Sequence, residues 1–156
     1  MKHICFTGHR NIKINQDLAP HLEEILRKLI QEENAVEFYS GGAIGWDMLC
    51  AQTVLNLRNE FPHIRLNLIL PCGNEEQTAL WNATDKKLFM EILSDADSIE
   101  FTSDKYYNGC MKKRNQRLVE LSDCCVCYYN IRNKFSGTGQ TVRMAESKGV
   151  PIINLY

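Results

Sequence analysis

Short apolar runs alternate along the chain with longer amphipathic stretches. The apolar runs predict strands, because each holds five or six residues bounded by glycine, proline or polar clusters; they cover residues 3–8, 36–40, 65–70, 98–102, 124–129 and 151–155. The amphipathic stretches repeat apolar residues at helical spacing; they cover residues 17–33, 46–60, 83–94, 110–121 and 138–148. We expect Asp17 to cap the first helix.

This order of elements predicts the fold class. Strands that alternate with helices at this interval pair in parallel through right-handed crossovers, and nearly continuous apolar strands fit a sheet covered on both faces. We therefore predict an α/β fold of the Rossmann-like, doubly wound kind, with a mainly parallel sheet and helices on both faces. No linker or repeat divides the chain, so residues 1–156 are expected to form one domain. In such sheets, ligands bind beyond the carboxyl ends of the strands.

The residues after the first strand are the first candidates for such a site. They are Thr7, Gly8, His9 and Arg10. Glycine lets a ligand approach the backbone, and the planar fork of arginine suits a phosphate or a carboxylate. An ordinary turn with a surface arginine would use the same residues.

The loop after the second strand opens directly into a helix. It reads Ser40-Gly41-Gly42-Ala43-Ile44-Gly45-Trp46-Asp47. Its glycines allow a tight turn whose amides converge at a helix N-terminus, where an anion is favoured. The G-G-x-x-G spacing after a second strand differs from the dinucleotide fingerprint. Asp47 either contacts the ligand or caps the helix.

The loop after the fifth strand has the same character. Gly137, Thr138, Gly139 and Thr141 open the last helix and supply amide and hydroxyl donors, which predicts a second phosphate site. A flexible glycine turn is the alternative.

Further candidates follow the third and fourth strands. Pro71 ends the third strand, and Gln77 and Trp81 beyond it could hold a base or a ribose, although such a tryptophan often only packs. Tyr106 could stack on a base. The basic run at 112–117 contains Arg114 and is typical of a solvated helix face.

Composition and charge narrow the functional classes. The 156 residues are 44% hydrophobic and 24% charged, and no apolar run approaches the roughly 18 residues of a membrane helix, so we expect no membrane partner. The first residues lack a secretion signal, and most of the seven cysteines lie in apolar stretches, which favours the cytoplasm. A net charge of −1 argues against nucleic acid as a partner. Cys124 should face away from Cys125 and Cys127, so we expect no zinc.

Together these motifs resemble those of the YpsA-like family in the SLOG superfamily, which also holds the lonely-guy phosphoribohydrolases and the DprA DNA-processing proteins. The resemblance covers almost the whole chain and rests on residues 7–10, 40–47, Arg114-Asn115, 122–123 and 136–141. It implies a Rossmann-like fold and a pocket, including Arg114 and Asn115, for a nucleotide or an ADP-ribose-like ligand. It implies no required cofactor, and it is compatible with a homodimer.

The resemblance leaves enzymatic activity open. In lonely-guy enzymes an arginine acts with a glutamate just after a Gly-Gly-x-Gly-Thr turn. Arg114 matches that arginine, whereas Thr141 or Arg143 stands where the glutamate is expected, and Glu146 lies too far along. Cleavage of an N-glycosidic bond usually needs a carboxylate. We therefore predict a binding module, with a hydrolase that uses Asp47 or Glu146 and a DNA-binding or protein-binding scaffold as alternatives.

Overall fold

Parallel strands form a single sheet at the centre of the molecule. A computed structural model describes residues 1–13 and 15–156. Within this range the strand order is β4-β3-β2-β1-β5-β6, and the neighbours pair in parallel. The strands are β1 (Lys2–Gly8), β2 (Ala35–Ser40), β3 (Arg65–Leu70), β4 (Ser98–Phe101), β5 (Cys124–Tyr128) and β6 (Ile152–Asn154). The predicted fold class is confirmed.

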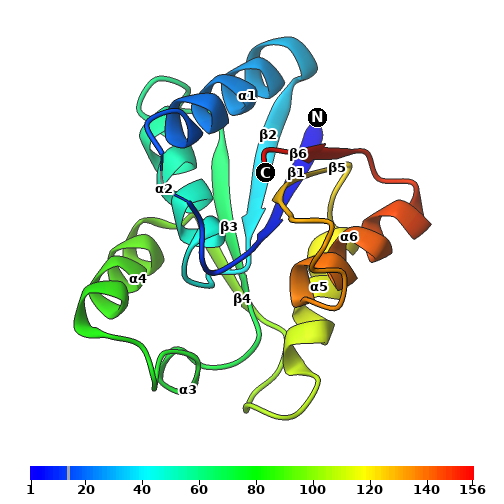
Figure 1. The fold of residues 1–156 in the computed structure, drawn as a ribbon. Coiled ribbons are helices and arrows are strands. Elements are labelled where there is room, and N and C mark those ends of the chain that lie inside the picture. The colour runs from blue at the N-terminus through cyan, green and yellow to red at the C-terminus, as the bar shows by residue number, and fades with distance from the viewer. Residues whose placement is uncertain (14) are drawn as a thin grey trace.

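Helices cover both faces of the sheet (Figure 1). They are α1 (Leu18–Glu33), α2 (Trp46–Arg58), α3 (Asn74–Gln77), α4 (Ala83–Asp95), α5 (Cys110–Glu120) and α6 (Gly137–Lys148). Helices α1, α2 and α4 lie on one face, and α5 and α6 lie on the other. The chain runs outward from β1 to β4 and then returns through α5 to β5, on the other side of β1. The boundary between β1 and β5 is therefore the topological switch point, where doubly wound folds bind ligands.

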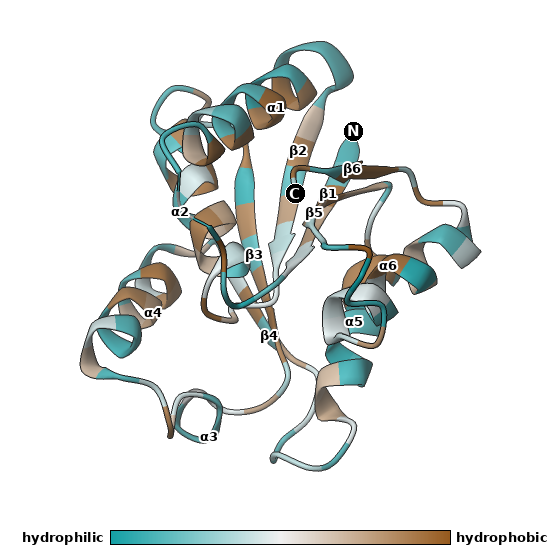
Figure 2. Cartoon of the chain, in the orientation of Figure 1, coloured by the Kyte–Doolittle hydropathy of each residue, from teal (hydrophilic) through white to brown (hydrophobic). Residues whose placement is uncertain are grey.

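Two hydrophobic layers enclose the sheet, because side chains along each strand alternate between its faces. In β5, Cys124 and Val126 pack in the layer under α1 and α2, whereas Cys125 and Cys127 pack in the layer under α5 and α6. This confirms the predicted opposite orientation of Cys124. Figure 2 shows the hydrophobic residues gathered on the strands and on the inward faces of the helices. In the described chain, no helix is long and apolar enough to cross a bilayer.

Two local expectations differ from the structure. The side chain of Asp17 makes no capping hydrogen bond, because its backbone is helical rather than extended. Instead, Oδ1 of Asn15 accepts hydrogen bonds from the amides of Asp17 and Leu18, each at 2.9 Å. Asp17 therefore stands at the expected N-cap position, but the side chain that caps the helix is that of Asn15. Helix α3 also lies in a segment where we expected only a loop, since its four residues are too few to show a helical period.

Candidate functional site

A cleft of about 330 Å³ lies at the carboxyl end of β1, bordered by α5 and by the starts of α2 and α6. Ten of the residues predicted from the sequence line it: Thr7, Gly8, His9, Arg10, Ala43, Asp47, Arg114, Asn115, Gly137 and Thr138. The fold therefore brings together the loop after β1, the loop before α2, and the start of α6. Ligand contact by these residues stays a prediction.

The glycine loop before α2 has already used several of its amides. The amide of Gly42 donates to Oγ of Ser40 at 3.3 Å, and the amide of Ala43 donates to Oδ2 of Asp47 at 3.2 Å. The amide of Trp46 donates to the carbonyl of His9 at 3.3 Å. A carboxylate of the chain itself therefore accepts an amide of the glycine loop, where we expected a phosphate. Contact of this loop with a ligand stays a prediction.

Two glycines of this loop make its packing possible. A Cβ at Gly41 would lie 2.5 Å from Nη1 of Arg114 and 2.8 Å from Oδ2 of Asp47, so the missing side chain lets these two groups approach each other. Gly45 has a φ of 82°, and a Cβ there would lie 2.1 Å from the carbonyl oxygen of Arg10. Both glycines therefore let residues that line the cleft pack closely against the loop.

Asp47 is the buried acid of the cleft. Its exposed fraction is 6%, and among the described residues its Oδ1 atom has no hydrogen-bond partner. Burial raises the pKa of Asp47 to about 6, although Arg114, the Ala43 amide and Arg10 all act in the opposite direction. A carboxyl group with this pKa exchanges its proton near neutral pH, so Asp47 can accept hydrogen bonds as a carboxylate or carry a proton.

Arg114 is the buried cation beside it, also with an exposed fraction of 6%. Its Nη1 donates to the carbonyl of Gly41, its Nε donates to Oδ1 of Asn115 at 2.8 Å, and its Nη2 lies 3.8 Å from Sδ of Met111. Burial lowers the pKa of Arg114, and the charge of Asp47 partly compensates. The guanidinium group stays charged and is fixed in direction by α5 and the glycine loop.

The start of α6 offers unpaired donors. Oγ of Ser136 accepts the amide of Gly139 at 3.0 Å, and the carbonyl of Ser136 accepts the amide of Gln140 at 3.0 Å. The amides of Gly137 and Thr138 belong to the first turn and have no acceptor within the helix. Both residues line the cleft. The start of α6 therefore has the donors that an anion requires.

Arg10 is the exposed cation at this cleft. Its side chain forms no ion pair or hydrogen bond with any residue that the structure describes, yet its charge acts on both Asp47 and Arg114. Because Arg10 lines the cleft without a partner among the described residues, it is available to an anionic ligand.

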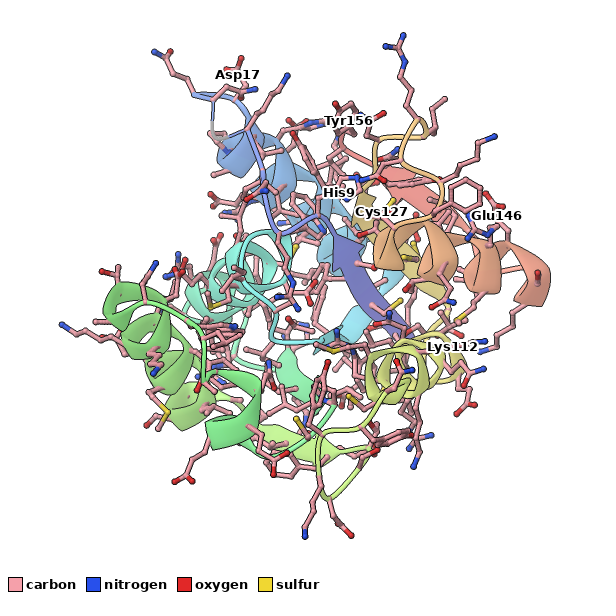
Figure 3. All side chains as sticks on the ribbon, turned by 60° about the horizontal axis from the view of Figure 1, so that its bottom comes forward. His9, Asp17, Lys112, Cys127, Glu146 and Tyr156 are labelled. Carbon is pink, nitrogen blue, oxygen red and sulfur yellow. The ribbon has the colours of Figure 1, made fainter. Side chains whose placement is uncertain are left out.

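His9 joins the loops after β1 and β5. Its amide donates to the carbonyl of Tyr128 at 3.3 Å, and its Nε2 accepts the amide of Asn130 at 2.9 Å. An accepting Nε2 carries no proton, so the ring is neutral and protonated on Nδ1. Burial lowers the pKa of His9, which agrees with this state. Figure 3 labels His9 on the segment after β1, seen from the carboxyl side of the sheet.

The other predicted residues lie outside the lining of the cleft. Gln77 donates from Nε2 to the carbonyl of Gly42 at 3.1 Å. The ring of Trp81 packs edge-on against that of Phe89, with 5.3 Å between the ring centroids. Tyr106 is 61% exposed. The remaining members of this group are buried or support the loops: Pro71, Gly41, Gly42, Gly45, Gly139 and Thr141. Their predicted contacts with a ligand stay predictions.

Four lining residues were absent from the predicted set: Phe6, Met111, Leu118 and Ser136. Met111 and Leu118 lie at helical spacing in the stretch 110–121, which indicates that they point inward but not that they border a cleft. Ser136 could have been found, because a serine directly before a helical segment is a typical N-cap. Glu146, one of the two acids considered for catalysis, is exposed on α6 and does not line the cleft (Figure 3).

Comparison with known proteins shows the family. Residues 4–152 match the model of the YpsA family, described as the YspA SLOG family. The chain belongs to the YpsA SLOG family. Its relatives in curated sequences include the SPbeta prophage-derived protein YoqJ of Bacillus subtilis, 29% identical over 141 residues that cover 83% of this chain and 80% of YoqJ. A UPF0398 protein of Bacillus pumilus is 27% identical over 142 residues, which cover 83% of this chain and 74% of that protein. The predicted family is confirmed.

Two solved structures share the fold of this YpsA family member. One is DNA processing protein A from Helicobacter pylori, described for its single-stranded DNA binding mode. It superimposes with a TM-score of 0.65 at 20% identity, and the superposition covers 98% of this chain and 64% of that protein. The structural-genomics target TM1055 superimposes with a TM-score of 0.59 at 18% identity, and the superposition covers 97% of this chain and 72% of TM1055. At these identities the likeness concerns the fold alone.

Proposed function

We propose that this protein binds a nucleotide-derived ligand, such as ADP-ribose, in the cleft beyond β1. The observation that carries the proposal is the convergence of the first-turn amides of Gly137 and Thr138 with Arg10, a cation without a partner among the described residues. A phosphate group of the ligand lies at this end of the cleft, where the helix dipole and the guanidinium group both favour it.

The size of the cleft limits which part of the ligand it encloses. Ligand pockets commonly measure about 300–1,000 Å³. At about 330 Å³, this cleft lies at the lower end of that range. It suits a mononucleotide or one half of a dinucleotide-like molecule, with the rest of a larger ligand extending outward.

Calorimetric titration and thermal unfolding with AMP, ADP, ADP-ribose and NAD test the proposal. A ligand that binds the folded state raises the melting temperature by mass action. Replacing Arg10 with Gln should weaken binding about tenfold, the usual effect of losing one hydrogen bond to a charged group. Arg65→Gln is the matched control, because Arg65 lies at the amino end of β3, where its Nε is 3.5 Å from Oε1 of Glu37, and it does not line the cleft. The absence of a shift with every nucleotide would overturn the proposal.

The same samples distinguish binding from catalysis. Asp47 is a buried carboxylate in the cleft lining, and its Oδ1, which has no hydrogen-bond partner within the described part of the chain, could serve a hydrolase as an acid or a base. Chromatography of the nucleotides after incubation would reveal cleavage. Unchanged nucleotides together with a thermal shift support a binding module, and released base or phosphate would assign a hydrolase.

A second candidate function is the binding of single-stranded DNA. The structural neighbour from Helicobacter pylori binds such DNA, which leans against our expectation that nucleic acid is not a partner. Tyr106 and Tyr107 are 61% and 46% exposed, and Lys112 and Lys113 follow them on α5. Stacking on aromatic rings beside cations is how many proteins hold single strands. Fluorescence anisotropy with an oligothymidine should show binding that weakens steeply as the salt concentration rises. The double variant Tyr106→Ala, Tyr107→Ala should lose this binding.

A further inference from the structure

The cleft contains a buried hydrogen-bond acceptor that the described residues leave unused. Oδ2 of Asp47 accepts the amide of Ala43, whereas Oδ1 has no partner among the described residues although Asp47 is 6% exposed. A buried polar atom without a hydrogen bond is costly, and native structures rarely keep one. Because Asp47 lines the cleft, a group that enters the cleft can supply the missing donor.

Unused donors lie beside this acceptor. A guanidinium group has five N–H bonds. In the described part of the chain, those of Arg114 reach the carbonyl of Gly41, Oδ1 of Asn115 and, weakly, Sδ of Met111. These contacts occupy three of the five. Arg114 also lines the cleft, and both its Nη1 and Oδ2 of Asp47 lie within 3 Å of the Cβ position at Gly41.

A hydroxyl group matches this pair of side chains. We propose that Asp47 and Arg114 together bind a sugar hydroxyl of the ligand, which donates to Oδ1 of Asp47 and accepts from Arg114. A hydroxyl can donate and accept at the same time, which a carbonyl or an ammonium group cannot. This inference rests on the proposed function and gives the ligand a class, a phosphorylated sugar or nucleotide with a free hydroxyl.

Charge gives the ligand its orientation. A phosphate at the α2 side of the cleft would meet the carboxylate of Asp47 and be repelled, whereas the start of α6 offers amides and Arg10. An ammonium group beside Asp47 would meet two arginines, Arg10 and Arg114. The phosphate therefore lies toward α6 and the hydroxyl toward α2.

Paired ligands test the hydroxyl directly in the unaltered protein. AMP and 2′,3′-dideoxy-AMP carry the same phosphate and base and differ only in the ribose hydroxyls. We expect calorimetry to show roughly tenfold or more weaker binding of the dideoxy compound, because its binding leaves Asp47 and Arg114 unsatisfied. The two monodeoxy compounds then show which hydroxyl is bound.

A variant links the discrimination to Asp47. Asp47→Asn replaces the acceptor with an amide, so the ratio of the two affinities should fall toward one. Asp85→Asn, which changes a half-buried acid in the first turn of α4 outside the cleft lining, is the matched control and should keep the ratio of the unaltered protein. Equal binding of AMP and 2′,3′-dideoxy-AMP overturns the hydroxyl inference and leaves the proposed function standing. Binding of neither compound, nor of any other nucleotide tested, overturns the proposed function itself.

Discussion

At the scale of single residues, the close approach of Trp46 requires a glycine at position 8. The indole is fully buried, stacks on Tyr128 at 5.5 Å, and donates from Nε1 to the carbonyl of Val126 at 3.4 Å. A Cβ at Gly8 would lie 2.3 Å from the indole ring. We therefore expect Gly8→Ala to destabilise the protein by about 1–3 kcal/mol, as overpacking of cores usually does.

Urea unfolding measures this effect against a matched substitution. Gly73→Ala adds the same methyl group where no atom of the described residues lies within 4 Å, so it should leave the unfolding midpoint close to that of the unaltered protein. Equal midpoints for the two variants would show that Trp46 can move without cost and would contradict the packing argument.

Asp47 makes stability depend on pH. Burial raises its folded-state pKa from 3.8 to about 6, so the folded protein holds a proton that the unfolded chain has released between these values. Stability from this group is therefore complete below pH 4 and is lost as the pH rises to about 6, a change of about 3 kcal/mol. The charges and thiols that face it are Arg114, Arg10, Cys50 and Cys5.

Asp47→Asn removes this titration. Urea unfolding at several pH values gives the free energy of unfolding of this variant and of the unaltered protein. The difference between them should change steadily in favour of the variant from pH 4 to pH 6 and should be constant above pH 7. A constant difference across this range would mean that Asp47 titrates as an exposed carboxyl group.

At the scale of elements, the cap of α6 serves both stability and the anion site. Oγ of Ser136 accepts the amide of Gly139, and Oδ1 of Asn82 caps α4 in the same way by accepting the amide of Asp85 at 2.8 Å. We expect Ser136→Ala and Asn82→Ala each to cost about 1 kcal/mol in thermal unfolding. Only Ser136→Ala should also weaken nucleotide binding, because only Ser136 lines the cleft. Equal loss of binding in both variants would point to general destabilisation.

Elements could be predicted from the sequence more fully than their hydrogen bonds. The runs at 65–70 and 124–129 have clear apolar patterns, and the structure places β3 and β5 there within one residue. Helix α3 shows no pattern at four residues. The amides of the loop before α2 looked free in the sequence, because the carbonyl of His9, which accepts the amide of Trp46, lies far away in the chain and reaches the loop only after folding.

At the scale of the whole molecule, the switch point between β1 and β5 assembles the cleft. The alternation of elements predicted a parallel sheet, but the strand order depends on the return of the chain from β4 to β5, which no local pattern encodes. Three strand-end segments that looked equivalent in the sequence therefore acquire different roles. The segments 7–10 and 136–138 line the cleft, whereas 41–45 mainly holds Asp47 and Arg114 in place.

Hydrogen exchange measured over the whole chain can separate these roles. The amides of Gly42 and Ala43 already donate to Ser40 and Asp47, so they should be protected in the free protein and change little when AMP is added. The amides of Gly137 and Thr138 should exchange rapidly in the free protein and slow markedly with AMP, because neither has an acceptor among the described residues and the ligand supplies one. The reverse pattern, with slowing confined to 41–45, would place the phosphate at the start of α2 and require the carboxylate of Asp47 to give up its bond to Ala43.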